Sequence, residues 1–193
     1  GETNTNDLYV YRDTDGDGVA DEKKPFYIGG NRGGNLEHQP SGLIWSMDNW
    51  LYTTYNAYRL RHKDGEILKE STAPNGGQWG LTQDNHGKPW YVNAGGERGP
   101  LNFQTPIVYA ALNAKDQFAA NYRIVYPLVP IPDGQGGTRR CRPKEKTLNH
   151  FTATCGAEVY RGDRLPKELF GNLFFGEPVG RLIRRTIIEN DDG

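Results

Sequence analysis

Short runs of apolar, β-branched and aromatic residues alternate with polar turns along much of the chain. Asp64-Gly65 interrupts the alternating run 58–70 and is a strong signal for a two-residue hairpin turn. A second turn is expected at Met47–Asn49, so that residues 42–56 hold two strands. The other strand-like runs are residues 7–13, 80–96, 156–162, 172–178 and 180–193. This pattern predicts an all-β protein.

Glycines that open predicted strands recur at a regular spacing. Gly42 and Gly80 are 38 residues apart, and Gly156 follows after 76, which is twice that spacing. A repeat of about 40 residues with several short strands is typical of β-propeller blades. We therefore expect residues 1–193 to form a single partial propeller domain of about three to four four-stranded blades. A complete small β-sandwich is the alternative.

A propeller closes when its last blade packs against its first, because an open one leaves sheet faces and edges bare. We therefore expect the chain to be a fragment of a longer propeller whose remaining blades complete it. The opening residues "GETNTNDLYVYRD" resemble the middle of a domain, so a leader and further residues are expected upstream.

Charge and cysteine content narrow the class of protein. The 193 residues carry 23 basic and 24 acidic side chains, and there is no basic stripe, so a nucleic-acid partner is not expected. No apolar run is long enough to cross a membrane, and no signal peptide is visible. Cys141 and Cys155 form no CxxC or CxxCH motif, and they are either a disulfide pair or two buried thiols.

The acidic stretch "DTDGDGVADE" has the spacing of a calcium loop. Its carboxylates occupy the first, third, fifth and ninth positions of the loop, and glycine occupies the sixth. The expected ligands are Asp13, Asp15, Asp17, the carbonyl of Val19, and Asp21. An EF-hand is excluded because Lys24 replaces the twelfth-position Glu and the flanks predict strands. We expect a structural calcium ion, since without a cation these carboxylates would repel one another; a solvated acidic turn is the alternative.

Other conspicuous residues have simpler interpretations. His38 stands between Glu37 and Gln39 just before a predicted strand, where a histidine is more often structural than catalytic. The four tryptophans are expected to pack inside blades rather than to stack on a ligand: Trp45, Trp50, Trp79 and Trp90. The remaining histidines, at 62, 86 and 150, lack metal-ligand spacing, and the basic residues 137–146 predict a solvated loop.

Three segments, covering about two fifths of the chain, together resemble one family. They are "EHQPSGLIWSMDNWLYTTYN" (residues 37–56), "NGGQWGLTQDNHGKPWYVNAGGERGPLN" (75–102) and "GAEVYRGDRLPKELFGNLFFGEPVGRLIRR" (156–185). In this order they resemble the soluble quinoprotein sugar dehydrogenases, six-bladed propellers that use pyrroloquinoline quinone (PQQ). The resemblance is greatest to the propeller domains of large bacterial membrane-bound dehydrogenase-like proteins, which often carry a c-type haem domain.

The resemblance implies a role for several residues. His38 matches the general base that takes the substrate hydroxyl proton, and Glu37 could orient its ring. Asn75 matches a PQQ contact, and the carbonyls of Gly99 and Pro100 match those that hold a calcium ion against the quinone. Arginines of the last segment, Arg181 or Arg185, would neutralise PQQ carboxylates. Pro74 stands where the family has its catalytic arginine, and Arg98 or Arg32 could take over that role.

The expected function is therefore the oxidation of a sugar or related alcohol, by hydride transfer to PQQ, in the periplasm or outside the cell. Electrons would pass to a cytochrome. The alternative is a non-catalytic, calcium-stabilised propeller that acts as a binding or assembly module in a larger haem protein. A carbohydrate-binding propeller or a polysaccharide lyase is a third possibility.

Overall fold

The computed structural model describes residues 5–35, 39–72, 79–92, 95–96, 143–144, 146, 150–151, 154–178 and 181–188. In these residues the regular structure consists of five small antiparallel sheets and a 3₁₀ turn, η5 (Lys167–Leu169). No α-helix occurs among them, and none of the sheets closes on itself. The all-β prediction is thus confirmed. No helix in this part of the chain is long and apolar enough to cross a membrane.

The first sheet is a four-stranded meander from one continuous segment. Its strands are β3 (Ile44–Trp45), β4 (Leu51–Tyr52), β5 (Tyr58–Lys63) and β6 (Glu66–Ser71), paired in that order. Asp64 and Gly65 join β5 to β6 with φ angles of 52° and 86°. Positive φ at both positions is what a type I′ hairpin turn requires. The four strands expected in residues 42–70 and both of their predicted turns are confirmed.

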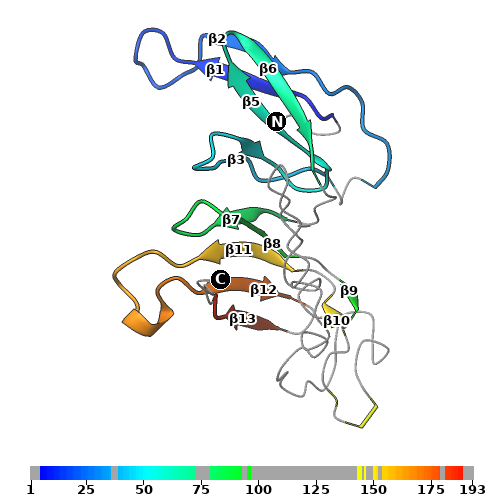
Figure 1. Ribbon diagram of the computed structural model, residues 1–193, viewed down its shortest axis with the longest axis vertical. Coiled ribbons are helices and arrows are strands. Elements are labelled where there is room, and N and C mark those ends of the chain that lie inside the picture. Colours follow the sequence, from blue (N-terminus) through cyan, green and yellow to red (C-terminus); the bar gives the residue numbers. More distant parts are fainter. Residues whose placement is uncertain are drawn as a thin grey trace.

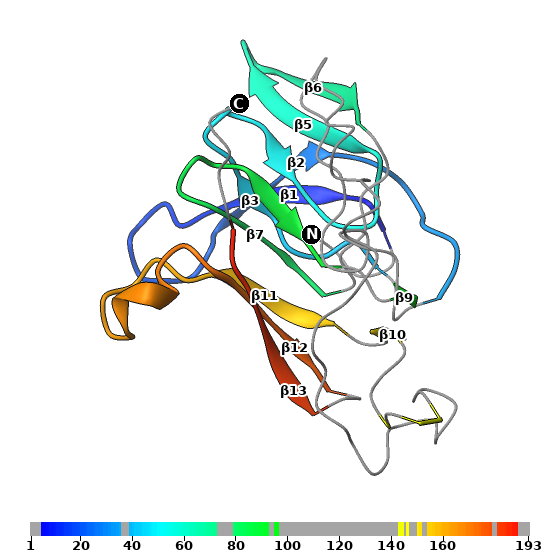
Figure 2. The same ribbon diagram turned by 60° about the horizontal axis from the view of Figure 1, so that its bottom comes forward.

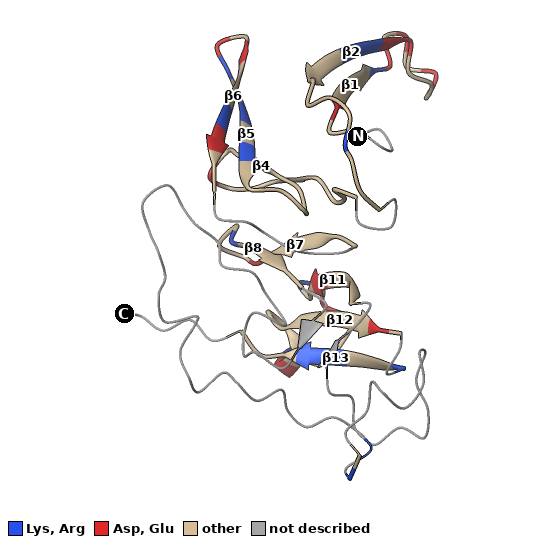
Figure 3. Ribbon diagram, turned by 90° about the vertical axis from the view of Figure 1, so that its right-hand side faces the viewer, with Lys and Arg blue, Asp and Glu red and all other residues tan. Residues whose placement is uncertain are grey.

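A two-stranded sheet follows, formed by β7 (Leu81–Gln83) and β8 (Pro89–Tyr91). The third sheet contains β11 (Cys155–Val159), β12 (Leu173–Glu177) and β13 (Leu182–Thr186), with β12 in the centre. The β7–β8 sheet lies between the other two (Figures 1 and 3). We call it the middle sheet.

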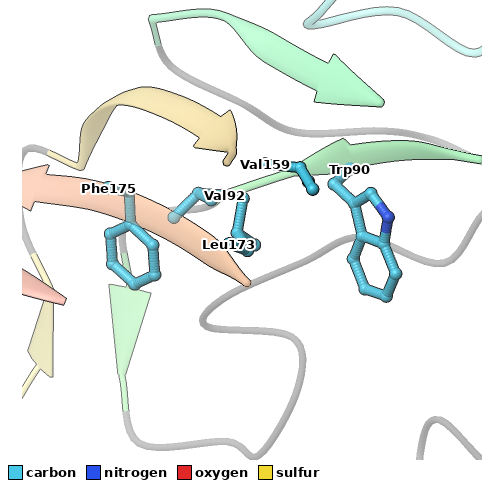
Figure 4. Close-up of a cluster of buried hydrophobic side chains, with 5 residues drawn as sticks. All are labelled: Trp90, Val92, Val159, Leu173 and Phe175. Atoms are coloured by element: carbon cyan, nitrogen blue, oxygen red, sulfur yellow. The ribbon is translucent and has the colours of Figure 1, made fainter. Parts of the chain in front are cut away.

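The middle sheet is packed on both faces because successive strand residues point to opposite sides. Tyr91 and Leu81 face the first sheet and pack against Trp50 and Tyr52. On the other side, a second cluster joins the middle and third sheets: Trp90, Val92, Val159, Leu173 and Phe175 (Figure 4). These two clusters hold most of the buried hydrophobic side chains of the described residues.

The opening strands β3, β7 and β11 begin at the same end of their sheets. A β-carbon on Gly42, just before β3, would lie 3.3 Å from the Cα atom of Gly80, just before β7. Thr154, just before β11, donates a 3.3 Å hydrogen bond to the carbonyl of Val92. Val92 follows β8, beside the start of β7, because Leu81 pairs with Tyr91. We call this end the glycine end.

The same five-residue turn closes β3–β4 and β7–β8 at the opposite end. In residues 46–50 the Ser46 and Asn49 amides donate to the carbonyls of Trp50 and Ser46. In residues 84–88 the same two bonds recur 38 residues later along the chain. Asn49 and Gly87 occupy equivalent places, with φ angles of 66° and 74°. The predicted spacing is thus matched by repeated local structure.

The N-terminal hairpin consists of β1 (Leu8–Arg12) and β2 (Glu22–Tyr27). It lies beside strands β5 and β6 of the first sheet (Figures 1, 2 and 3). Tyr27 connects the hairpin to the first sheet, since its hydroxyl accepts a 2.9 Å hydrogen bond from Lys69 Nζ and its ring lies 5.8 Å from that of Tyr58. A short pair, β9 (Gly95–Gly96) with β10 (His150–Phe151), completes the regular structure described.

The expectation that all four tryptophans pack inside blades is correct for two of them. Trp50 and Trp90 are buried, whereas Trp45 and Trp79 are 58% and 38% exposed. Trp45 follows Ile44 in a two-residue strand, so its side chain points away from the face that Ile44 packs on. Its indole instead donates a 2.7 Å hydrogen bond to Asn49 Oδ1. Trp79 lies in the turn before Gly80, outside any strand.

Candidate functional site

The acidic loop, residues 13–21, forms the exposed tip of the N-terminal hairpin (Figure 3). It is flanked by β1 and β2, as predicted, so the EF-hand exclusion agrees with the structure. Arg12 pairs with Glu22 at its base, and the Asp21 amide donates a 3.0 Å hydrogen bond to the Arg12 carbonyl. The strands therefore fix the two ends of the loop close together.

Backbone amides preform this loop around its carboxylates. Asp13 accepts hydrogen bonds from the Gly16 amide through Oδ1, at 2.6 Å, and from the Gly18 amide through Oδ2, at 2.9 Å. Asp21 Oδ2 accepts from the Thr14 amide and hydroxyl at 2.8 and 2.7 Å. Hydrogen bonds to an ionised carboxylate favour the charged form. The bonds from Gly18 and Gly16 therefore lower the pKa of Asp13, and those from Thr14 lower the pKa of Asp21.

Three carboxylates in this loop are close enough to share one cation. Asp13, Asp15 and Asp21 each offer an oxygen, and these oxygens lie within 4.8 Å of one another. Two oxygens that bind one calcium ion at about 2.3–2.6 Å can be no more than about 5 Å apart. The donor set is all oxygen, which suits calcium. The residues present therefore fit a calcium ion.

The other two expected ligands are Asp17 and the carbonyl of Val19. Asp17 lies outside the converging set, and its Oδ1 accepts a 2.7 Å hydrogen bond from the Val19 amide. Val19 is an exposed residue of the same loop, with 65% of its surface accessible. The exposure of the whole loop leaves room for water to complete a coordination shell of six to eight oxygens.

The two arginines assigned to PQQ by the resemblance lie at opposite ends of the β12–β13 hairpin. Arg181 is in the connecting turn, with φ of 54°, next to the Glu177–Leu182 pair at the glycine end. Arg185 pairs with Phe174 near the other end, and its Nη2 donates a 2.8 Å hydrogen bond to the Glu168 carbonyl. A ligand at the glycine end would therefore meet Arg181 rather than Arg185.

The remaining residues implied by the resemblance lie outside the described residues: Glu37, His38, Asn75, Arg98, Gly99 and Pro100. Cys141 also lies there, and Cys155 is a free, half-buried thiol. Gln39, which follows His38, is described, and its Oε1 accepts a 3.3 Å hydrogen bond from Arg32 Nη1. Arg32 is therefore held against the segment that carries the predicted base.

A buried polar network in the first sheet was missed by the sequence analysis. Arg59, only 4% exposed, donates hydrogen bonds to Asp48, Tyr52 and Glu70 at 3.1, 2.8 and 2.7 Å, and its guanidinium carbon lies 4.5 Å from the Trp50 ring centre. Burial and the hydrogen bond to Asp48 raise the pKa of Tyr52 well above its ordinary value. Burial acts to lower the pKa of Arg59, but its bonds to Tyr52 and Glu70 outweigh that effect and raise it.

A second missed residue is Glu177 at the end of β12. Its side chain is fully buried, which is uncommon for a glutamate. The available sequence signal is the alternation in "LFFGE", where Leu173, Phe175 and Glu177 share the buried face. Glu177 pairs with Leu182, which follows Arg181. The glycine end of the third sheet therefore carries one acidic and one basic residue.

Comparison with known proteins gives a family but no characterised relative. No curated protein matches the chain, and no solved structure matches it. The model of one family, described as "Domain of unknown function (DUF7133)", matches residues 3–193. The match covers the hairpin, the three stacked sheets and the acidic loop. The chain belongs to the DUF7133 family.

Proposed function

We propose that the chain is a segment of a β-propeller that is stabilised by calcium and acts as a binding or assembly module in a larger haem protein. Consecutive sheets pack face to face, and their opening strands begin at the same end. The equivalent turns 46–50 and 84–88 are 38 residues apart, a spacing that is typical of consecutive propeller blades. These features favour radial blades over a sandwich of two sheets.

The observation that carries the proposal is the convergence of the carboxylates of Asp13, Asp15 and Asp21 at a hairpin tip. The bound ion would neutralise their repulsion and hold the loop in place. The base of the same hairpin, near Leu8 and Tyr27, lies at its other end. The ion would therefore have a structural role, with no part in chemistry at the glycine end.

Calcium titration by isothermal calorimetry tests the proposal. The wild-type protein should bind calcium, and Asp13→Asn should lose most of that affinity because it removes a charged ligand. Asp163→Asn, a substitution in the exposed segment before η5, is the matched control and should bind as the wild type does. If the wild-type protein binds no calcium at millimolar concentration, or if both variants bind it equally, the proposed ion site is wrong.

A second candidate function is that of a quinoprotein dehydrogenase, supported by the three ordered resemblances and by Arg181 at the glycine end. Bound PQQ would supply the hydride acceptor for oxidation of a sugar or related alcohol. His38 would take the substrate hydroxyl proton, and Glu37 would orient its ring. Asn75, Arg98 and the carbonyls of Gly99 and Pro100 would hold the quinone and its calcium ion. The location would be periplasmic or extracellular, with a c-type cytochrome as electron acceptor.

Reconstitution distinguishes the two functions. The protein would be mixed with PQQ and calcium, quinone uptake followed by quenching of tryptophan fluorescence, and dye reduction measured with a panel of aldoses. If the protein is a dehydrogenase, it should take up PQQ and reduce the dye. His38→Ala should abolish dye reduction. Arg181→Gln should weaken PQQ uptake, whereas Arg185→Gln should not. Absence of both uptake and turnover supports the binding module.

A further inference from the structure

A cavity of about 340 Å³ lies between the base of the N-terminal hairpin and the glycine end of the first sheet. Four leucines line its apolar part: Leu8, Leu43, Leu51 and Leu60. Polar residues from three separate segments complete the wall, among them Asn6, Gln39, Ser41, Thr53 and Tyr58. A cavity of this size is at the lower end of the range for small-molecule sites, and its mixture of apolar surface and a few polar groups is typical of them.

Some polar groups of the cavity wall already form hydrogen bonds within the protein, and others can bind a ligand. The Asp7 carboxylate accepts hydrogen bonds from the Gly29 and Gly30 amides at 2.8 and 2.9 Å, so it holds the wall in shape. The Asn6 side chain, by contrast, has no hydrogen-bond partner among the described residues, although its backbone amide donates to the Gly30 carbonyl. Its amide offers both a donor and an acceptor. Asn6 can therefore bind a hydroxyl group.

Arg32 supplies a positive charge beside this cavity. Its Nη1 donates to Oε1 of the wall residue Gln39 at 3.3 Å, and its guanidinium carbon lies 5.5 Å from the ring centre of Tyr55. The side chain is half-buried, and no described carboxylate forms an ion pair with it. A partly buried guanidinium without an ion pair to a described carboxylate favours an anionic ligand. A carboxylate suits it best, because its two oxygens can accept two parallel hydrogen bonds from the planar guanidinium.

The backbone beside this cavity is strained at Tyr55. Tyr55 has a φ angle of 56°, in the left-handed region that a bulky side chain rarely occupies. It belongs to the β4–β5 connection, as does the wall residue Thr53. Strained residues of this kind concentrate at ligand sites, where the surrounding structure holds them. Here the strained Tyr55 places its aromatic ring against Arg32, which is hydrogen-bonded to the wall residue Gln39.

We propose that this cavity binds a small hydroxylated carboxylate, with its carboxylate on Arg32, a hydroxyl on Asn6, and its carbon chain over the leucines. The site shares no residue with the acidic loop, which lies at the far end of the hairpin. The inference therefore goes beyond the proposed function, and either can fail without the other.

Calorimetric titration of the protein with sodium gluconate tests the inference. Gluconate should bind, and Arg32→Gln should weaken binding by about 10- to 100-fold, as expected for loss of a charged hydrogen-bonded partner. Arg161→Gln, in the exposed loop before η5, is the matched control and should leave the affinity unchanged. Glucose, which has similar hydroxyls but no carboxylate, should bind at least tenfold more weakly than gluconate.

Asn6→Ala tests the same site without altering charge, and nuclear magnetic resonance locates the ligand. Gluconate should shift the resonances of Asn6, Gln39 and Tyr58 in the wild-type protein, and the Asn6→Ala affinity should fall severalfold. The proposal is overturned if folded wild-type protein binds no gluconate, if glucose binds equally well, or if Arg32→Gln binds as tightly as Arg161→Gln. Calcium affinity measured on Arg32→Gln should equal that of the wild type, which separates this result from the ion site.

Discussion

The middle sheet and the N-terminal hairpin are both two-stranded, yet they are stabilised in different ways. The middle sheet has only three residues in each strand, and five of these six are buried between neighbouring sheets. The hairpin has longer strands that are mostly half-buried or exposed, and its tip is held by hydrogen bonds to carboxylates. A two-stranded unit alone is marginally stable in water. Packing against neighbouring sheets stabilises the first unit, and hydrogen bonds to carboxylates stabilise the tip of the second, so strand length is not what decides stability here.

The largest expected effect comes from removing a core side chain beside the middle sheet. Phe175 is 1% exposed and packs in the cluster with Trp90, so Phe175→Ala should lower the free energy of unfolding by about 3–5 kcal/mol. Guanidinium denaturation followed by tryptophan fluorescence measures it. Phe170→Ala is the control, because Phe170 is 51% exposed, and it should change stability by less than about 0.5 kcal/mol. Similar losses in both variants would contradict the packing described.

A pair of glycine substitutions compares the two regions directly. Gly42 has φ of 59°, and a β-carbon there would lie 2.5 Å from Leu81 Cδ2, inside the contact between the first and middle sheets. Gly18, at the hairpin tip, has φ of 90° but no atom within 4 Å of such a carbon. Gly42→Ala should therefore cost about 2–4 kcal/mol, from backbone strain plus overlap. Gly18→Ala should cost about 1–2 kcal/mol, from strain alone.

Thermal and chemical denaturation of the two glycine variants measure this difference. A Gly18→Ala variant less stable than Gly42→Ala would show that the tip, and not the contact between sheets, dominates stability. Equal losses would show that Leu81 moves aside without cost.

Acidification should loosen the hairpin tip while the core remains intact. Hydrogen bonds from backbone amides hold the pKa values of Asp13 and Asp21 below their ordinary 3.8. A depressed pKa contributes stability that is fully present above the unfolded value and is lost as pH falls through the folded one. Amide protection of Gly16 and Gly18, corrected for intrinsic exchange rates, should therefore hold above pH 3.8 and decline below it. Protection that is unchanged at pH 2 would show that these carboxylates do not support the loop.

Turns and strands that depend on a few adjacent residues could be predicted from the sequence. The Asp64-Gly65 hairpin, the turn after Ser46 and the strands flanking the acidic loop all depend on a few adjacent residues, and each is confirmed. The spacing of the acidic loop predicted that four carboxylates converge, and three of them do: Asp13, Asp15 and Asp21, whereas Asp17 lies outside the set.

Features that depend on distant neighbours were predicted poorly. Trp45 and Trp50 look equivalent in sequence, but which one is buried depends on the middle sheet, which supplies Leu81 and Tyr91 to one face only. Arg59 lies in a strand rich in charged residues and was not singled out from the sequence, yet it forms hydrogen bonds with Asp48 and Glu70 once the strands pair. The cavity beside Arg32 combines segments near residues 6, 40 and 58, and local pattern does not show that they meet.

Hydrogen exchange with and without calcium tests the central claim that an ion holds the hairpin tip separately from the packed sheets. Calcium should slow exchange of the amides of residues 14–19 and leave those of β12 unchanged. Magnesium, which demands a tighter octahedral shell, should have little effect. Calcium-independent exchange in the loop, or equal slowing throughout β12, would contradict that claim.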